Sequence, residues 1–242
     1  MYMRKFWGFY DNGNYKVGCN GQTLYLYDAE GNELAKFRDI PYAYGGAFKP
    51  QTNIFVLRST EGRIAVYDCD ARKLLYKFRY SSVDGCQDDF FCFSRDGESL
   101  LNIERSPNSL RSRLSIYETQ SFSLVKRLFD QDPSLVLDHI ECSENPGAYD
   151  VLFSERNENG IIHKSYIGVL AHDQLIQIQP IPRKAADFLA SYKYIQAHGF
   201  TEKAMSWSGL HYMGYTNDEI LKFKERDFTI ASFPQIADEF AK

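Results

Sequence analysis

The chain has 242 residues, of which 44% are hydrophobic and 15% aromatic, including 17 tyrosines and 18 phenylalanines. This composition supplies material for a sizeable core and favours strands over helices. The formal net charge at pH 7 is −4, from 28 basic and 32 acidic residues. Because nucleic-acid-binding domains usually present a basic face, this balance argues against a nucleic-acid partner.

The sequence also argues against membrane insertion and secretion. No stretch approaches the roughly 18 consecutive apolar residues that a membrane helix needs. The first residues reach Asp11 before any apolar run long enough for a secretory signal. The five cysteines are odd in number and irregularly spaced, so we expect reduced structural thiols, with neither a disulfide framework nor a zinc site. These features predict a cytoplasmic protein.

The first predicted hairpin joins the strands Lys5–Tyr10 and Tyr15–Cys19. Its turn contains Asn12-Gly13, a favoured pair because both residues tolerate positive φ. A strand that ends in an aromatic residue and an acid follows at Leu24–Asp28, and an outer strand follows at Glu33–Phe37. The order strand, turn, strand, loop, strand, turn, strand predicts one four-stranded sheet.

The same order of parts recurs along the chain, most clearly in Phe90–Glu118. The recurring third strand is the anchor of each copy, and its anchor residues are Tyr27, Tyr67, Tyr117, Val169 and Phe223. The steps between these residues are 40, 50, 52 and 54. A four-stranded propeller blade typically takes roughly 40 to 50 residues, and longer loops account for the later steps. A lone sheet that is apolar on both faces cannot be stable, whereas sheets arranged around an axis cover each other.

We therefore predict an all-β fold, a single five-bladed β-propeller of four-stranded antiparallel blades over residues 1–242. The predicted blades span about 5–38, 45–80, 88–129, 136–180 and 191–233. Short helical turns are expected near 183–190, where a proline precedes apolar residues at helical spacing, and near 234–241. A closed ring predicts a compact monomer, and an open ring that a partner completes is the alternative.

Two segments resemble a known repeat family. Ala47-Phe48-Lys49-Pro50 and Phe91–Gly97 resemble the Phe-Ser-Pro-Asp-Gly turn of WD40-type and YVTN-type propeller repeats, and Val66-Tyr67-Asp68 stands where WD40 repeats carry Trp-Asp. The resemblance covers residues 5 to about 130 and implies a propeller that binds other proteins. The Gly-His and Trp of typical repeats are absent from it, so their His-Asp network is not implied.

The candidate site lies on the loops of one propeller face. Because successive strands alternate in direction, the loops that enter each blade share a face with the loops between its second and third strands. These loops carry acids, tyrosines and arginines, which suit a protein partner, although aspartate is also simply common in turns. The predicted partner-binding residues are Asp39, Tyr42, Tyr44, Asp84, Asp88, Asp89, Asp130, Asp132, Arg105, Arg111 and Arg113.

The sequence contains no recognisable catalytic, cofactor or metal motif. The five histidines show no metal-ligand spacing, although His139 and His198 fall near strands that would line a central channel. Ser206–Gly209 lacks the nucleophile-elbow pattern. We therefore predict a non-catalytic interaction module or scaffold without cofactors. The alternatives are a glycoside-acting enzyme with funnel carboxylates such as Asp89 and Asp138, and a carbohydrate-binding lectin.

Overall fold

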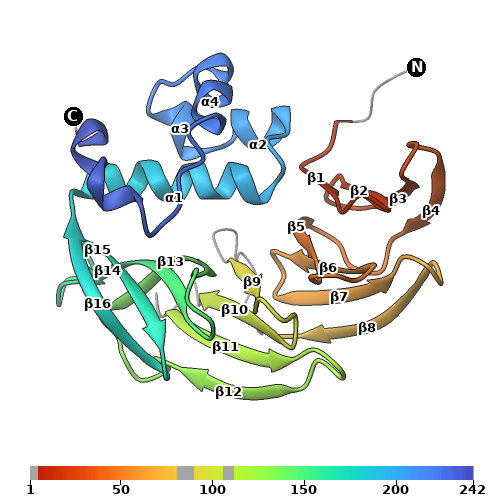
Figure 1. The fold of residues 1–242 in the computed structure, drawn as a ribbon, viewed down its shortest axis with the longest axis horizontal. Helices are drawn as coiled ribbons and strands as arrows, with labels where there is room; N and C mark the ends of the chain where they lie inside the picture. Colours follow the sequence, from red (N-terminus) through yellow and green to blue (C-terminus); the bar gives the residue numbers. More distant parts are fainter. Residues whose placement is uncertain (1–4, 81–89, 106–111, 242) are drawn as a thin grey trace. The chain divides into compact units, whose positions relative to one another are not determined.

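The computed structural model describes residues 5–80, 90–105 and 112–241. Within these ranges, sixteen strands form four antiparallel sheets of four strands each (Figure 1). In every sheet the strands lie in chain order, so each strand pairs with its sequence neighbours. Four of the five predicted blades are thus present as four-stranded sheets, and the helices follow them in the chain.

The bounds of the strands define the four sheets. The first sheet consists of β1 (Gly8–Asp11), β2 (Tyr15–Cys19), β3 (Leu24–Asp28) and β4 (Glu33–Phe37). The second consists of β5 (Ala43–Phe48), β6 (Ile54–Ser59), β7 (Arg63–Asp68) and β8 (Lys73–Arg79). The third consists of β9 (Phe91–Phe93), β10 (Ser99–Arg105), β11 (Ser112–Glu118) and β12 (Leu124–Leu128). The fourth consists of β13 (Leu135–Cys142), β14 (Tyr149–Arg156), β15 (Ile162–Ala171) and β16 (Gln174–Ile181).

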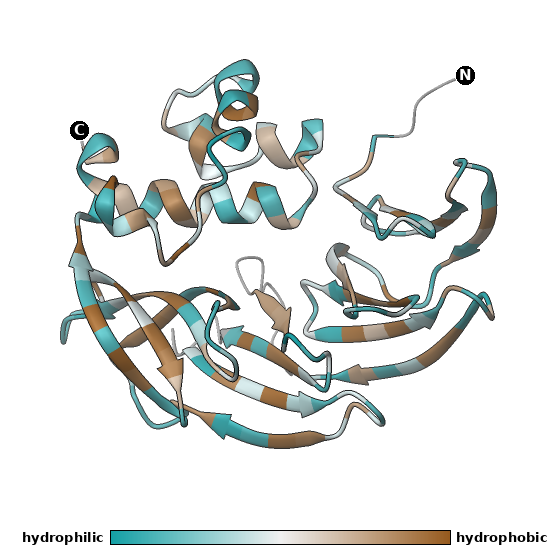
Figure 2. Cartoon of the chain, viewed as in Figure 1, coloured by the Kyte–Doolittle hydropathy of each residue, from teal (hydrophilic) through white to brown (hydrophobic). Residues whose placement is uncertain are grey.

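Inner and outer strands of a sheet differ in burial and therefore in sequence. In β7 the four residues from Ile64 to Tyr67 are all buried, whichever face of the sheet they point to. The outer strand β8 is mostly exposed and carries three basic residues. Figure 2 shows hydrophilic and hydrophobic segments alternating along the outer strands β8, β12 and β16. A charged outer strand discourages pairing with another sheet edge.

Side chains fix the tight turns that the sequence predicts. The Asn12 Oδ1 accepts hydrogen bonds from the backbone N–H groups of Asn14 and Tyr15, at 3.1 and 2.8 Å, while Gly13 has a φ of 89°. In the third sheet, Asp96 accepts from the Glu98 N–H at 2.9 Å. These local bonds hold each hairpin in register because they satisfy backbone donors that the turn leaves unpaired.

The predicted fifth blade, over residues 191–233, is wrong. The segment that follows β16 is helical, and its elements are α1 (Arg183–Ala197), α2 (Glu202–Ser206), α3 (Gly209–Tyr212), α4 (Asn217–Lys224), η1 (Phe233–Gln235) and η2 (Ala237–Phe240). The helical turns expected near 183–190 and 234–241 are therefore found, the first as the start of a longer helix. None of the four strands of that blade is formed, and its anchor residue Phe223 lies in α4.

Capping residues explain why this segment is helical. The side chains of Thr201, Ser208 and Thr216 accept hydrogen bonds from the first turns of α2, α3 and α4. At α4 the cap is reciprocal, because the Glu219 side chain also accepts from the Thr216 backbone. Such caps satisfy the free N–H groups of a helix start and favour helix over strand.

The chain divides into two compact units. The first contains residues 1–85 and 192–225, and the second contains residues 86–191 and 226–242. In the first unit a core that includes Val17, Leu26 and Phe55 lies between the first two sheets. The second unit has a core that includes Ile103 and Phe153.

The C-terminal turns of the second unit pack on the start of α1 through four phenylalanines, called here the phenylalanine cluster: Phe188, Phe228, Phe233 and Phe240. The Phe188 ring stacks on Phe240 with centroids 3.9 Å apart and meets Phe228 edge-on at 5.6 Å. All four side chains are buried. This packing gives the helical segment a hydrophobic core of its own.

In the first unit, the end of α1 is fastened to the start of the first sheet. The Phe9 N–H donates to the His198 carbonyl at 3.3 Å, and the Thr201 hydroxyl donates to the Trp7 carbonyl at 2.6 Å. Gly199 has a φ of 70°, and a Cβ at this position would lie 2.1 Å from the Phe9 carbonyl oxygen. Only glycine suits this close approach. The contact places α2 beside Trp7.

Candidate interaction surface

The segment Arg38–Tyr44 connects the first two sheets and includes the first two residues of β5, and it is held by backbone contacts on both sides. The Ala43 N–H donates to the Gly21 carbonyl at 3.1 Å, which ties the loop to the β2–β3 turn. The Thr60 N–H donates to the Tyr42 carbonyl at 3.0 Å, which ties it to the β6–β7 turn. Within this unit, an entering loop therefore shares a face with loops between second and third strands, as strand alternation predicts.

Four aromatic residues, Trp7, Tyr42, Tyr44 and Trp207, make up what we call the aromatic surface. The Trp7 ring meets Tyr44 edge-on with centroids 5.1 Å apart, and it meets Trp207 in the same manner at 5.6 Å. Trp207 is 66% exposed and Tyr42 is 51% exposed. The Lys203 ammonium lies 5.2 Å from the centre of the Trp7 ring, in cation–π range. The surface therefore offers large apolar side chains to solvent beside a positive charge.

The backbone beneath the aromatic surface leaves little freedom to its side chains. Tyr42 has a φ of 51°, an uncommon conformation for a bulky residue that its contacts must maintain. The Tyr44 ring lies over Gly21, where a Cβ would come within 2.5 Å of the ring. Burial, and next the neighbouring Tyr42 hydroxyl, raises the pKa of Tyr44. Both tyrosines are thus placed by the loop and its neighbours.

Polar but uncharged groups lie under the Tyr44 backbone. The Tyr10 hydroxyl donates to the Tyr44 carbonyl at 3.3 Å and accepts from the Gly46 N–H at 2.8 Å. The Cys19 thiol also donates to the Tyr44 carbonyl, at 3.0 Å, and burial raises its pKa to about 12. Burial lowers the pKa of His198 to about 4, so this histidine is neutral at pH 7. Its Nδ1 lies 2.7 Å from the Tyr194 carbonyl oxygen.

Asp39, the acid of the same loop, is half-buried and turned toward its own sheet. Burial is the main cause of the raised pKa of Tyr67. The Asp39 carboxylate raises it further, because its negative charge lies nearby and it accepts a hydrogen bond from the Tyr67 hydroxyl. The Lys77 ammonium donates to the Asp39 carbonyl at 3.4 Å. Asp39 therefore stabilises the loop as well as belonging to the predicted site.

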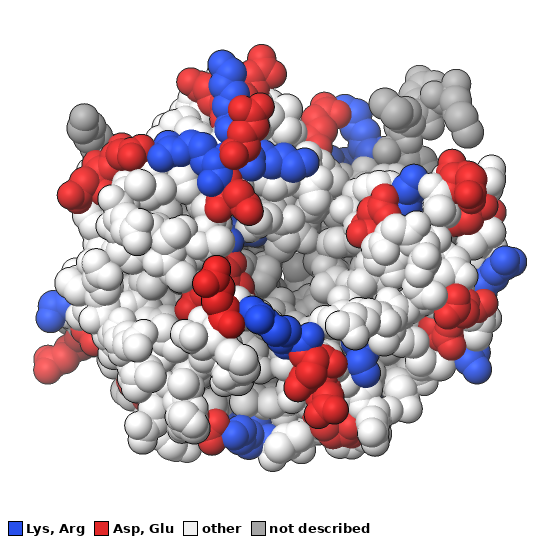
Figure 3. Space-filling model, in the orientation of Figure 1, with Lys and Arg blue, Asp and Glu red and all other residues white. Residues whose placement is uncertain are grey.

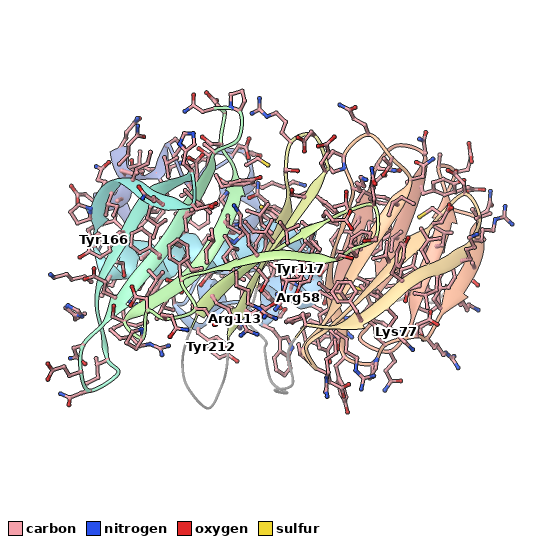
Figure 4. The ribbon with its side chains drawn as sticks, turned by 90° about the horizontal axis from the view of Figure 1, so that it is seen from below. Arg58, Lys77, Arg113, Tyr117, Tyr166 and Tyr212 are labelled. Atoms are coloured by element: carbon pink, nitrogen blue, oxygen red, sulfur yellow. The ribbon has the colours of Figure 1, made fainter. Side chains whose placement is uncertain are left out.

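In the second unit, the structure brings together the predicted residues Arg113 and Asp130. Their closest atoms are 3.3 Å apart, and the Arg113 Nε donates to the buried Glu104 at 2.6 Å. The Tyr117 hydroxyl donates to the other Glu104 oxygen at 3.0 Å, and Figure 4 shows Arg113 and Tyr117 on the same strand. Burial, followed by Glu104, raises the pKa of Tyr117. These charges satisfy one another within the sheet.

Asp132 acts as a turn residue. Its carboxylate accepts hydrogen bonds from the Ser134 N–H at 2.9 Å and from the Ser134 hydroxyl at 2.7 Å. These bonds lower the pKa of Asp132, although partial burial opposes them. The turn role that aspartate commonly plays is therefore observed at this position.

The remaining predicted residues have no described side chain. Asp84, Asp88, Asp89 and Arg111 lie outside the described residues, and Arg105 ends β10 with a side chain outside them. On the face seen in Figure 3, acidic and basic side chains are interspersed, without a continuous area of either sign.

Sequence reasoning missed Trp7, Lys203 and Trp207. Trp207 follows the short helix α2, in the segment predicted to form the fifth blade. A signal was nevertheless available, because the chain has only two tryptophans and both belong to the aromatic surface. A tryptophan beside glycine and serine in a polar segment is a candidate surface residue, since tryptophan otherwise favours burial.

The alternative chemistry would use acidic residues near a central funnel. Asp138, one of the two suggested funnel carboxylates, accepts a hydrogen bond from the Ser154 hydroxyl at 2.9 Å, and Asp89 lies outside the described residues. The part of the chain that the structure describes has no cluster of three histidine, cysteine or acidic residues placed to hold a metal ion. In the same part, no helix is long and apolar enough to cross a membrane.

Comparisons with known proteins identify the fold. No family model and no curated protein matches the sequence. Among solved structures, the chain is similar to hydrazine synthase from Kuenenia stuttgartiensis, with 14% identity and a TM-score of 0.57 over 72% of this chain and 52% of that one. It is also similar to the WD40 domain of Toxoplasma gondii coronin, with 12% identity and a TM-score of 0.52 over 74% of this chain and 47% of that one. A third is the Pan2 WD40 domain of Neurospora crassa, with 10% identity and a TM-score of 0.50 over 72% of this chain and 52% of that one.

The four sheets have the fold of β-propeller blades, as in the WD40 domains among these structures. This confirms the resemblance seen in the sequence at the level of fold. The chain spans about half the length of the solved chains it matches. At these identities the similarity identifies the fold alone, and the neighbours include both an enzyme and WD40 domains, so function has to be argued from this chain's own residues.

Proposed function

We propose that the chain is a non-catalytic protein-interaction module that binds a protein partner through the aromatic surface. The observation that carries this proposal is the exposure of Trp207, at 66%, against the Trp7 ring, which also contacts Tyr44. Tryptophan and tyrosine are the residues most enriched where a few side chains supply most of the binding energy. An exposed tryptophan is costly in water, and a partner that covers it removes this cost.

The fixed geometry of the loop Arg38–Tyr44 supports the same proposal. Its hydrogen bonds to two neighbouring turns hold Tyr42 and Tyr44 in place before any partner arrives. A preorganised surface loses less conformational entropy on binding than a flexible loop does. The WD40-like blades thus act as a rigid support for binding side chains, which is a common use of loops on stable scaffolds.

We propose that the charged residues of the predicted set make polar contacts with the partner. Some of these contacts would surround the aromatic residues, and the others would lie on further loops. Lys203, above Trp7, adds a cation that favours an acidic group on the partner near this point. The remaining proposed contacts are Asp39, Asp84, Asp88, Asp89, Asp130, Asp132, Arg105, Arg111 and Arg113. A cytoplasmic location and a monomeric state stay part of the prediction.

The glycoside-acting and lectin alternatives gain no support from the described residues. There the suggested acid Asp138 is engaged by Ser154. The lectin alternative requires equivalent polar and aromatic residues in every blade, whereas the aromatic surface belongs to the first unit and includes a residue from the helical segment. We therefore take the interaction module as the function.

Quantitative affinity capture from the protein's own cell extract tests the proposal. Wild-type chain is compared with Trp207→Ala, Tyr42→Ala and the matched control Val125→Ala, a residue that is 59% exposed on β12. Loss of a hot-spot aromatic residue costs about 2 kcal/mol or more, which weakens binding about 30-fold. We expect the same partner from wild type and Val125→Ala, and its loss from Trp207→Ala. Equal recovery by all four proteins would contradict the proposal.

A further inference from the structure

Two cysteines of the second unit lie in contact across neighbouring blades. Cys92 is the middle residue of β9, and Cys142 is the last residue of β13, so each belongs to the first strand of its sheet. Their thiols are in hydrogen-bond contact, and the Cys142 Sγ also lies 2.9 Å from the Phe93 carbonyl oxygen. Both are free cysteines of intermediate exposure.

The strands on either side hold the two thiols in this position. Cys92 pairs with Leu101 in the ladder of the third sheet, and Cys142 pairs with Tyr149 in the ladder of the fourth. The Arg95 guanidinium spans the gap between the sheets and donates to the Ser143 carbonyl at 2.9 Å. Both cysteines thus lie in paired strands, which keep the two thiols beside each other, and a disulfide requires the sulfurs to come to about 2.05 Å.

We propose that Cys92 and Cys142 form a reversible disulfide when the protein meets a hydroperoxide. The bond joins the first strands of the third and fourth blades. It is a redox modification within the second unit, and it is independent of the proposed partner-binding surface of the first.

The surroundings assign different roles to the two thiols. A hydrogen bond from Cys92 lowers the pKa of Cys142, and the positive charge of Arg95 lowers it further. Partial burial and the negative charges of Asp96 and Glu141 act in the opposite direction but do not cancel this effect. The hydrogen bond with Cys142, and then burial, raises the pKa of Cys92. Cys142 is therefore the thiol that reacts first as a thiolate, and Cys92 is the thiol that resolves the intermediate.

The chemistry balances with hydrogen peroxide as oxidant. The Cys142 thiolate attacks one peroxide oxygen, so that an S–O bond forms, the O–O bond breaks and hydroxide leaves. Cys92 then loses its proton and attacks the sulfur of the Cys142 sulfenic acid; the S–S bond forms, and the second oxygen leaves as water. In sum, two thiols are oxidised by two electrons, and one hydrogen peroxide is reduced to two waters. A small-molecule thiol reverses the change by disulfide exchange.

The other described cysteines provide matched controls. Cys19 donates to a backbone carbonyl in the same manner, at 3.0 Å, but it is 1% exposed and its neighbour is the Tyr10 hydroxyl. Cys69 is 2% exposed; burial, then Asp68 and Asp70, raises its pKa to about 12. Neither has a cysteine partner among the described residues. Cys86 lies outside them and is replaced by serine in a parallel variant.

The test treats the reduced full-length protein with hydrogen peroxide, blocks the remaining thiols under denaturing conditions and maps the peptides by mass spectrometry. We expect a mass loss of about 2 Da and a Cys92–Cys142 link that dithiothreitol removes. The link should persist in Cys86→Ser, and Cys19 and Cys69 should be fully alkylated. In Cys92→Ser, a sulfenic acid probe such as dimedone should label Cys142, and in Cys142→Ser no link to Cys92 should form.

Three results would overturn the proposal. The first is full alkylation of both Cys92 and Cys142 after peroxide treatment. The second is a link from either residue to Cys86 in place of their mutual link. The third is conversion of Cys142 to its sulfinic acid while Cys92 stays a thiol, which would mean that the resolving thiol is out of reach. None of these results bears on partner capture by Trp207→Ala, so the two proposals fail separately.

Discussion

Replacing Phe188 with alanine tests the phenylalanine cluster that supports the helical segment. The Phe188 side chain is 1% exposed, stacks on Phe240 at 3.9 Å and contacts Phe228 and Phe233 at centroid distances of 5.6 and 6.1 Å. Burial of this kind makes a phenylalanine-to-alanine change cost about 3 to 5 kcal/mol. Because each aromatic pair adds stability beyond its buried area, we expect a value near the top of this range.

The assay is equilibrium unfolding in guanidinium chloride, followed by far-ultraviolet circular dichroism. Ile178→Ala serves as the control, because Ile178 is 50% exposed on β16 of the same unit and its loss should change the free energy of unfolding by about 0.5 kcal/mol or less. If Phe188→Ala does not fold, Phe188→Leu replaces it, with an expected loss of about 1 to 2 kcal/mol. A loss below about 1 kcal/mol for Phe188→Ala would refute the described packing.

Three further predictions concern buried groups. Because burial lowers the pKa of His198 from 6.5 to about 4, the unfolded chain binds a proton at this residue before the folded chain does, and stability falls as the pH drops from 6.5 toward 4. The loss should reach about 3 kcal/mol and be smaller in His198→Gln, as measured by urea unfolding at pH 7 and pH 4; equal losses would contradict the argument. Glu104→Gln removes the charge that Arg113 contacts at 2.6 Å and should cost about 2 to 3 kcal/mol in the same assay at pH 7, whereas an unchanged midpoint would show that the ion pair contributes nothing. Gly199→Ala places a Cβ against the Phe9 carbonyl at positive φ and should lower the thermal midpoint by several degrees; an unchanged midpoint would contradict the close approach.

The first four blades could be predicted because their signals are local. Asn12-Gly13 and Asp96-Gly97 mark tight turns, and apolar alternation marks the strands on either side of them. The recurring anchor residue, a tyrosine in the first three blades and Val169 in the fourth, then relates one blade to the next. These signals depend on residues close together in the chain, so the sequence alone displays them.

The prediction of a fifth blade was wrong because the apolar residues of a short segment can match both the two-residue period of a strand and the 3.6-residue period of a helix. Tyr192–Ala197 alternates in polarity as a strand does, but the buried residues Ala185, Phe188, Leu189, Tyr192 and Ile195 follow the three-and-four spacing of a helix. Thr216 and Glu219 form a capping box that was also readable in the sequence. These two patterns predict helices, and they are stronger evidence in this segment than its weak match to the blade repeat.

The candidate site was predictable only in part. Tyr42 and Tyr44 were found because they lie where the chain enters the second blade, Tyr42 in the loop and Tyr44 at the start of β5. Trp7 and Trp207 are far apart in the sequence, and only the fold brings their rings to 5.6 Å. In the same way, the sequence cannot show that Arg113 is engaged by a buried acid on the neighbouring strand.

Tryptophan fluorescence tests the central proposal most directly, because both tryptophans of the chain belong to the aromatic surface. The measurement is a titration of the full chain with the captured partner, with acrylamide quenching before and after saturation. If the partner covers the surface, the emission should shift to shorter wavelength and quenching of Trp207 should fall, because the ring leaves water. Saturable binding with unchanged emission and quenching would contradict the proposed site.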